Sequence, residues 1–173
     1  MSLIFRELKA DEIECRIGMI KDDGLSLLLY KDARADQNIL DEAVGSMNWQ
    51  RKHLRDNANC IVSIWDEAKK QWIEKEDTGT ESNTEKEKGL ASDSFKRACV
   101  NWGIGRELYT APFIWIKNGD CTIGKTSAGK LYCHDNFAVT NIAYENKKIV
   151  GLAIKNLTTN KRVFLLMPKK EEK

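Results

Sequence analysis

Three strand-like segments follow one another closely in the first half of this 173-residue chain. They are Trp49 to Leu54, Asn59 to Trp65 and Gln71 to Asp77, and each contains aromatic or β-branched residues of the kind that favour strands. The connections, 55–58 and 66–70, are polar and too short for a crossover, so neighbouring strands should run antiparallel. The sequence therefore predicts a three-stranded meander.

A long helix is predicted after this meander. Thr84, with Glu87 three residues later, forms a capping box that opens a helix running to about Trp102. Apolar side chains then recur at i, i+4, i+7 and i+11, namely Ala91, Phe95, Ala98 and Trp102. Such a stripe buries one face of a helix against a sheet, and Lys96 and Arg97 project from the other faces.

The rest of the chain predicts short elements. Residues 3–12 read as an amphipathic helix, 13–20 and 25–30 as a hairpin, and 32–45 as a helix capped by Asp32 and stopped by Gly45. Further strands are predicted at 113–117, 137–143, 149–154 and 162–167. The expected fold is α+β in a single domain, with a core over 1–112, a β-rich extension over 113–173 and a frayed tail over 169–173.

Composition excludes several protein classes. The 42% hydrophobic and 31% charged residues with only 2 Pro fit a folded chain, and no apolar run reaches the roughly 18 to 20 residues that span a bilayer. The first nine residues lack the pattern of a secretory signal. The five cysteines are an odd number without a Cys-x-x-Cys pair, which fits free thiols in a reducing cytoplasm. We therefore expect a cytoplasmic protein that does not enter a membrane.

Charge is distributed unevenly along the chain. Residues 1–92 carry 14 basic and 19 acidic side chains, a net charge of −5, whereas residues 93–173 carry 14 and 7, a net charge of +7. Such asymmetry suggests a binding site for a polyanion.

Basic residues also lie among aromatic ones, as in channels for single-stranded nucleic acid, where cations follow the phosphates and rings stack on bases. The candidates are the strand residues Arg51, Lys52 and Arg55, which flank Trp49, and the helix residues Lys96 and Arg97. In the structural alternative the tryptophans belong to the core and Arg97 pairs with Asp93 one helical turn earlier.

Other chemistries have weaker support. The run from Gly124 to Lys130 matches the spacing of a phosphate-binding loop, but Leu131 replaces the hydroxyl residue that would hold magnesium. Cys121, Cys133, His134 and Asp135 do not form the two close ligand pairs of a zinc site. Carboxylates between Glu74 and Glu87 leave open a magnesium-dependent nuclease, although helix N-termini also favour such charges. We expect no cofactor and no metal.

The region from Trp72 to Tyr109 carries a composite signature. It contains Trp-Ile-Glu-Lys-Glu-Asp-Thr-Gly (72–79), Glu-Lys-Glu-Lys-Gly (85–89), Ala-Ser-Asp-Ser-Phe-Lys-Arg-Ala (91–98) and Asn-Trp-Gly-Ile-Gly-Arg-Glu-Leu-Tyr (101–109). As a set, these segments resemble the Rad-fifty-two single-strand annealing proteins, and more closely their phage and prophage relatives, the Sak-type recombination proteins. The likeness covers roughly residues 12 to 110.

The resemblance implies a β-β-β-α core in which a long helix crosses a curved antiparallel sheet, with subunits joined into a ring around which single-stranded DNA lies. It assigns phosphate contacts to Lys96 and Arg97 and groove positions to Arg16 and Tyr30. It implies ATP-independent annealing in homologous recombination or double-strand break repair, with no catalytic residue and a homo-oligomer. A host recombination protein is left open as a further partner. The alternatives are the nuclease and an oligomeric scaffold without affinity for DNA.

Overall fold

The computed structural model describes residues 3–80 and 86–168, with side chains from residue 89 onward in the second range. Thr84 of the expected capping box, the Glu87 side chain and the expected frayed tail, 169–173, lie outside these limits. The chain forms two compact units. The first contains residues 3–7 and 31–106, and the second contains residues 8–30 and 107–168.

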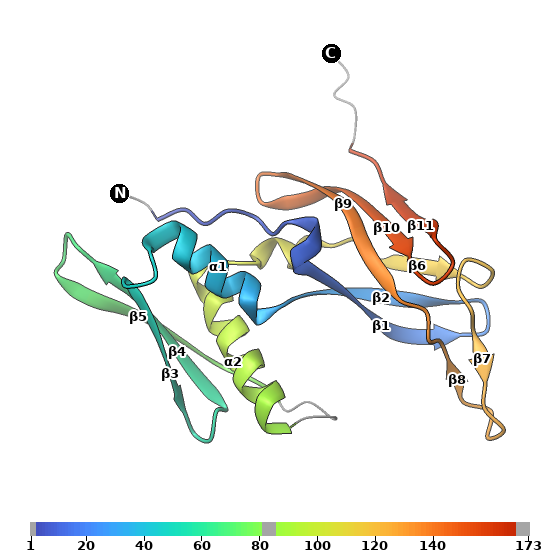
Figure 1. Ribbon diagram of the computed structural model, residues 1–173, viewed down its shortest axis with the longest axis horizontal. Coiled ribbons are helices and arrows are strands. Elements are labelled where there is room, and N and C mark those ends of the chain that lie inside the picture. Colours follow the sequence, from blue (N-terminus) through green and yellow to red (C-terminus); the bar gives the residue numbers. More distant parts are fainter. Residues whose placement is uncertain (1–2, 81–85, 169–173) are drawn as a thin grey trace, which may run out of the picture. The chain divides into compact units, whose positions relative to one another are not determined.

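The first unit combines a small sheet with two helices (Figure 1). Its strands are antiparallel in the order β3-β4-β5, and they are β3 (Trp49–Leu54), β4 (Asn59–Asp66) and β5 (Gln71–Thr78). The helices are α1 (Ala33–Val44) and α2 (Lys86–Trp102), and α2 packs on β4 and β5. The meander and both helices were expected from the sequence.

The apolar stripe of α2 forms the core of this unit. Phe95 and Ala98 are fully buried, together with the neighbouring Cys99. They pack on the face of the sheet that carries three buried residues of β4, namely Cys60, Val62 and Ile64. The indole of Trp102 donates a hydrogen bond of 3.0 Å to the carbonyl of Val62, so the helix is anchored at its C-terminal end.

Local signals mark the start of α1 and the ends of both helices where the sequence predicts them. The carboxylate of Asp32 accepts a hydrogen bond of 2.7 Å from the backbone N–H of Arg34, which satisfies a free donor at the start of α1. Gly45 follows α1 at φ +82°, and Gly103 and Gly105 follow α2 at φ +100° and +72°. These are conformations that only glycine adopts without strain.

The second unit is built on a six-stranded sheet with the order β11-β10-β9-β1-β2-β6. Its strands are β1 (Ile13–Lys21), β2 (Gly24–Lys31), β6 (Ile114–Lys117), β9 (Phe137–Glu145), β10 (Lys148–Asn156) and β11 (Lys161–Leu166). The two outermost strands, β11 and β6, approach each other, so the sheet curls nearly into a barrel. The short hairpin of β7 (Gly124–Lys125) and β8 (Leu131–Tyr132) and the 3-10 turns η1 (Ala10–Glu12) and η2 (Arg106–Thr110) complete the unit.

The α+β class is confirmed, with mostly antiparallel strands and two α-helices in the described residues. The helix predicted over residues 3–12 is wrong, because residues 3–9 have no regular secondary structure and only the 3-10 turn η1 follows. The backbone N–H of Leu8 donates to the buried carboxylate of Glu107 at 2.8 Å. In a helix, this N–H would instead donate to a backbone carbonyl of the preceding turn. None of the described helices has the length and apolar character needed to cross a membrane.

Candidate nucleic-acid interface

The predicted cations of β3 do not share one face. Pairing across the sheet places Trp49, Arg51 and His53 on the side of α2, and it places Lys52 on the opposite side. Arg55 lies beyond the end of β3, in the turn before β4, at φ +51°. Arg55, which the sequence predicted as a strand residue together with Arg51 and Lys52, therefore lies outside β3.

Arg51 and Trp49 meet the centre of α2. The Trp49 ring stacks on the ring of Phe95 with centroids 6.1 Å apart, and its Nε1 donates to Asp41 at 2.6 Å. The guanidinium of Arg51 lies 4.7 Å from the centroid of the Phe95 ring. Arg51 thus reaches from the sheet to Phe95, the helix residue next to Lys96. The Arg51 side chain is exposed, and its aliphatic part covers the core.

The two helix cations have different surroundings. Arg97 is bound through Nε to Oδ2 of Asp93 at 2.9 Å, so the pairing expected from the sequence as an alternative is confirmed. Lys96 is half-buried on the side of α1. The pKa of Asp32 is lowered, first by hydrogen bonds from Arg34 and more weakly by the charge of Lys96.

Four of the predicted cations form no ion pair with the residues that the structure describes. In the described ranges, no carboxylate oxygen lies within 4.0 Å of the side-chain nitrogens of Arg51, Lys52, Arg55 or Lys96. Other cations of the same unit are paired, among them Lys69 with Asp66 and Lys70 with Glu67. A cation without a local partner remains able to bind an external anion.

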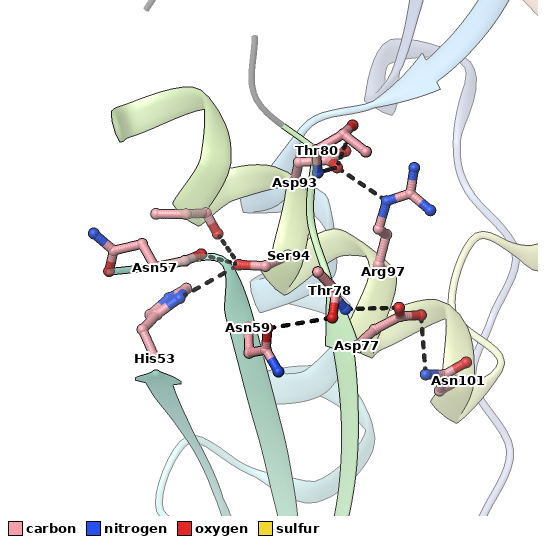
Figure 2. Close-up of polar contacts among 11 residues, drawn as sticks. His53, Asn57, Asn59, Asp77, Thr78, Thr80, Asp93, Ser94, Arg97 and Asn101 are labelled. Carbon is pink, nitrogen blue, oxygen red and sulfur yellow. Dashed lines mark hydrogen bonds and ion pairs between the residues drawn. The ribbon is translucent and has the colours of Figure 1, made fainter. Parts of the chain in front are cut away.

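Residues of the composite signature at the end of β5 and on α2 hold the helix in place (Figure 2). Asp93 accepts a hydrogen bond of 2.8 Å from the backbone N–H of Thr80, in addition to its bond with Arg97. Two helical turns further, the Asn101 amide donates to Oδ2 of Asp77 at 3.1 Å and to the carbonyl of Glu76 at 2.9 Å. The spacing Asp-x-Gly followed by Asp-x-Phe-Lys-Arg-Ala therefore serves to attach α2 to the end of β5.

The structure also brings together Ser94 and His53, a contact that the sequence did not predict. The Ser94 hydroxyl lies 3.5 Å from Nδ1 of His53 and donates to the carbonyl of Asn57 at 2.9 Å (Figure 2). Burial, and then the charge of Arg51, lower the pKa of His53. Since Ser94 is fully buried, this pair joins α2 to the β3–β4 turn and offers no exposed nucleophile.

Gly79 makes the close approach of strand and helix possible. A Cβ at this position would lie 2.6 Å from the backbone nitrogen of Ser94 and 2.9 Å from the carbonyl oxygen of Leu90. We expect Gly79→Ala to lower the free energy of unfolding by about 1–3 kcal/mol, because backbone atoms cannot move aside as a flexible side chain can. Urea unfolding followed by circular dichroism measures this loss.

The control for this substitution is Gly103→Ala. A Cβ at Gly103 would meet nothing within 4 Å, but its φ of +100° disfavours alanine. Gly103→Ala should lower the free energy of unfolding through backbone conformation alone, while α2 stays attached to β5. Unchanged stability in Gly79→Ala would mean that β5 and α2 separate more easily than their geometry indicates.

The carboxylates that could serve a nuclease are dispersed. Glu74 accepts from the Ser63 hydroxyl at 3.2 Å, Glu76 accepts from the Asn59 amide at 2.5 Å, and Asp77 is held by Asn101 on the other face of β5. Glu85 and the Glu87 side chain lie outside the described residues. Over 3–80 and 86–168, no group of three or more His, Cys, Asp or Glu side chains is arranged to hold a metal.

The second unit places Arg16 and Tyr30 together, on β1 and β2. The Arg16 guanidinium lies 4.5 Å from the centroid of the Tyr30 ring and forms an ion pair of 2.8 Å with Glu14. Both side chains are exposed. In the same unit, two residues of the possible metal-ligand set serve other contacts, since Asp135 accepts from the Asn156 amide at 2.8 Å and the His134 ring packs on Tyr132.

Comparison with protein-family models, with curated proteins and with solved structures finds no match to this chain. Its function must therefore be argued from its own residues.

Proposed function

We propose that this protein binds single-stranded DNA and promotes annealing of complementary strands without ATP, as a homo-oligomeric ring of the kind formed by Sak-type recombination proteins. The observation that carries the proposal is the set of unpaired cations on the first unit. Arg51, Arg55 and Lys96 lie on β3, its following turn and α2, and none has a carboxylate partner within the described residues.

This arrangement suits a ligand that is read through its phosphates. Annealing makes and breaks no covalent bond, and it requires a strand held by its backbone with bases left accessible for pairing. Cations that have no acidic partner contribute fully to phosphate binding, because no internal ion pair has to be broken first. Arg97 contributes less in this proposal, since a phosphate must compete with Asp93 for its guanidinium.

The order of elements supports the resemblance on which the proposal also depends. Strands β3, β4 and β5 precede α2 along the chain, and α2 packs on β4 and β5. This succession supports the β-β-β-α core that the resemblance implies. Arg16 and Tyr30, on the second unit, are proposed as further DNA contacts, and Arg16 covers one face of the exposed Tyr30 ring.

The deciding experiment mixes two complementary fluorescent oligonucleotides with the protein in the absence of ATP and in the presence of EDTA. We expect faster duplex formation that weakens as the salt concentration rises. Strands that neither bind nor pair faster would overturn the proposal and favour the scaffold alternative. If the strands are instead degraded when magnesium replaces EDTA, the nuclease is favoured.

Removing two unpaired cations should weaken DNA binding in a salt-dependent manner. In the double variant Arg51→Met and Lys96→Met, the side-chain stems that cover the core remain while both charges are removed. For single-stranded DNA we expect the slope of log affinity against log salt to fall by about 0.7 for each phosphate that is no longer neutralised, about 1.4 in total. Fluorescence anisotropy at several salt concentrations measures the slope.

The matched control is Lys69→Met with Lys70→Met, which removes the same net charge from the β4–β5 turn, where both lysines are ion-paired. Its salt slope should stay near that of the wild type. Equal slopes for both double variants would show that net charge alone attracts the DNA and that Arg51 and Lys96 form no site.

A further inference from the structure

The small sheet of the first unit has two open edges. In the order β3-β4-β5, only β4 has a strand on each side, and within residues 3–80 and 86–168 nothing pairs with the outer side of β3 or β5. Such edges present unpaired backbone donors and acceptors and are templates for another strand.

The pairing pattern shows which backbone groups point outward. The backbone N–H of Trp65 donates to the carbonyl of Asn48, so the β3 residues bonded to β4 are the even-numbered ones and the odd-numbered ones point outward. The β3 residues whose backbone N–H and C=O groups point away from β4 are Trp49, Arg51 and His53. By the same alternation, the β5 residues whose backbone groups point away from β4 are Trp72, Glu74 and Glu76, and the carbonyl of Glu76 accepts a hydrogen bond from Asn101.

The two edges carry opposite charges. From Trp49 to Arg55, β3 and its following turn contain three cations and no carboxylate, whereas β5 contains three carboxylates and one lysine. Charges on an exposed edge commonly prevent edge pairing. Here they discriminate between pairings, because β3 repels a second β3 and β5 repels a second β5, whereas β3 and β5 attract each other.

We propose that β3 of one copy pairs with β5 of a second copy, so that Lys52 of one copy faces Glu74 of the next. Both strands run antiparallel to β4 and hence in the same direction. A head-to-tail repeat that joins the sheets edge to edge preserves this direction, so the new pair is parallel. Because the two paired copies then retain one open β5 edge and one open β3 edge between them, the contact is heterologous and propagates until a ring closes.

The register follows from the outward groups. In a parallel pair, one residue bonds to the two residues that flank its opposite neighbour. With the N–H of Glu74 donating to the carbonyl of Arg51, and the N–H of His53 donating to the carbonyl of Glu74, Glu74 stands opposite Lys52. Both side chains lie on the face of the sheet away from α2. Opposite charges in this position stabilise a strand pair.

This inference rests on the proposed function, since it names the contact between copies of the proposed ring. It also separates the roles of neighbouring cations, because Lys52 serves the contact between copies, whereas Arg51, Arg55 and Lys96 are the cations assigned to DNA binding. Assembly is measured without DNA, so loss of annealing with intact assembly contradicts only the DNA-binding proposal.

Charge reversal across two copies tests the contact. By sedimentation velocity over a range of concentrations, we expect the wild type to assemble and Lys52→Glu and Glu74→Lys to raise the concentration of half-assembly about tenfold or more. When the two variants are mixed, a β3 edge of one variant can meet a β5 edge of the other with opposite charges, and assembly should return. The double variant in one chain should also assemble.

The control reverses charges at the β4–β5 turn, with Glu67→Lys and Lys70→Glu, whose ion pair lies away from the proposed register. Neither control variant should change assembly. A wild type that stays monomeric at all concentrations overturns the proposal, as does a wild-type oligomer that neither reversal disturbs. Failure of the mixed variants to reassemble, while their circular dichroism matches the wild type, overturns the pairing of Lys52 with Glu74.

Discussion

At about pH 8, replacing Lys31 by Met should lower the free energy of unfolding by about 3–5 kcal/mol, because it leaves a buried carboxylate without its counter-ion. Lys31 is 6% exposed and Asp36 is fully buried, and Nζ lies 2.5 Å from Oδ1 of Asp36 and 2.9 Å from the carbonyl of Ile104. The ammonium thus joins the start of α1 to the segment after α2. The other oxygen of Asp36 has no hydrogen-bond partner among the described residues.

The control for this prediction removes both charges. Lys31→Met combined with Asp36→Leu should recover most of the lost stability, since an apolar pair of similar volume has no charge to desolvate. Urea unfolding of the wild type and the variants measures the difference. If the single variant is as stable as the double variant, Asp36 reaches water and the pair is not buried as the structure has it.

The pH dependence gives a second readout of the same pair. Burial raises the pKa of Asp36 to about 7, and the charge of Lys31 opposes this rise. A carboxyl group whose pKa is higher in the folded state binds more protons when folded, so its contribution to stability falls as pH increases from about 4 to 7. Without Lys31 the pKa of Asp36 rises further. The loss of unfolding free energy in Lys31→Met should therefore be smallest near about pH 5 and larger at about pH 8.

Truncating Phe95 to Ala should also lower the free energy of unfolding by about 3–5 kcal/mol, because a cavity forms where α2 meets the sheet. Phe95 is fully buried, stacks on Trp49 and lies beneath Arg51. DNA affinity should fall as well, since Arg51 loses the ring over which it is positioned. Thermal unfolding and anisotropy titrations measure the two effects.

Phe95→Leu is the matched variant, as it retains most of the apolar volume and should have a smaller cost than Phe95→Ala. Arg51→Met, by contrast, should change stability little, because its guanidinium is exposed and its stem is retained. If Phe95→Ala loses as much DNA affinity as Arg51→Met, the ring of Phe95 contributes to DNA binding by positioning the Arg51 side chain. Wild-type stability in Phe95→Ala would contradict the packing of α2 on the sheet.

The sequence named candidate binding residues, but it did not determine how their side chains are arranged. A strand alternates its side chains, so Arg51 and Lys52 had to point in opposite directions, and the position of Arg55 depended on where β3 ends. The pairing of Arg97 with Asp93 could be expected from their spacing, because both lie on one helix. The unpaired state of Lys96 depends on how α1 and α2 pack, which no local pattern specifies.

Local chemistry determined most of the secondary structure. The Asp32 cap, the glycines after both helices, the apolar stripe of α2 and the short connections of the meander each act within a few residues, and each is found as expected. Residues 3–12 are the exception. Their apolar spacing favours a helix, but the buried carboxylate of the distant Glu107 takes the backbone N–H of Leu8.

Tertiary structure alone decided the partners. Strand β2 pairs with β6, and β1 pairs with the distant β9, although hydrophobic alternation marks each of them only as a strand. The buried Lys31–Asp36 pair, the contact of Ser94 with His53 and the two open edges of the small sheet have the same origin. Periodicity tells which face of an element is buried, but the identity of what covers it depends on the packing of the whole chain.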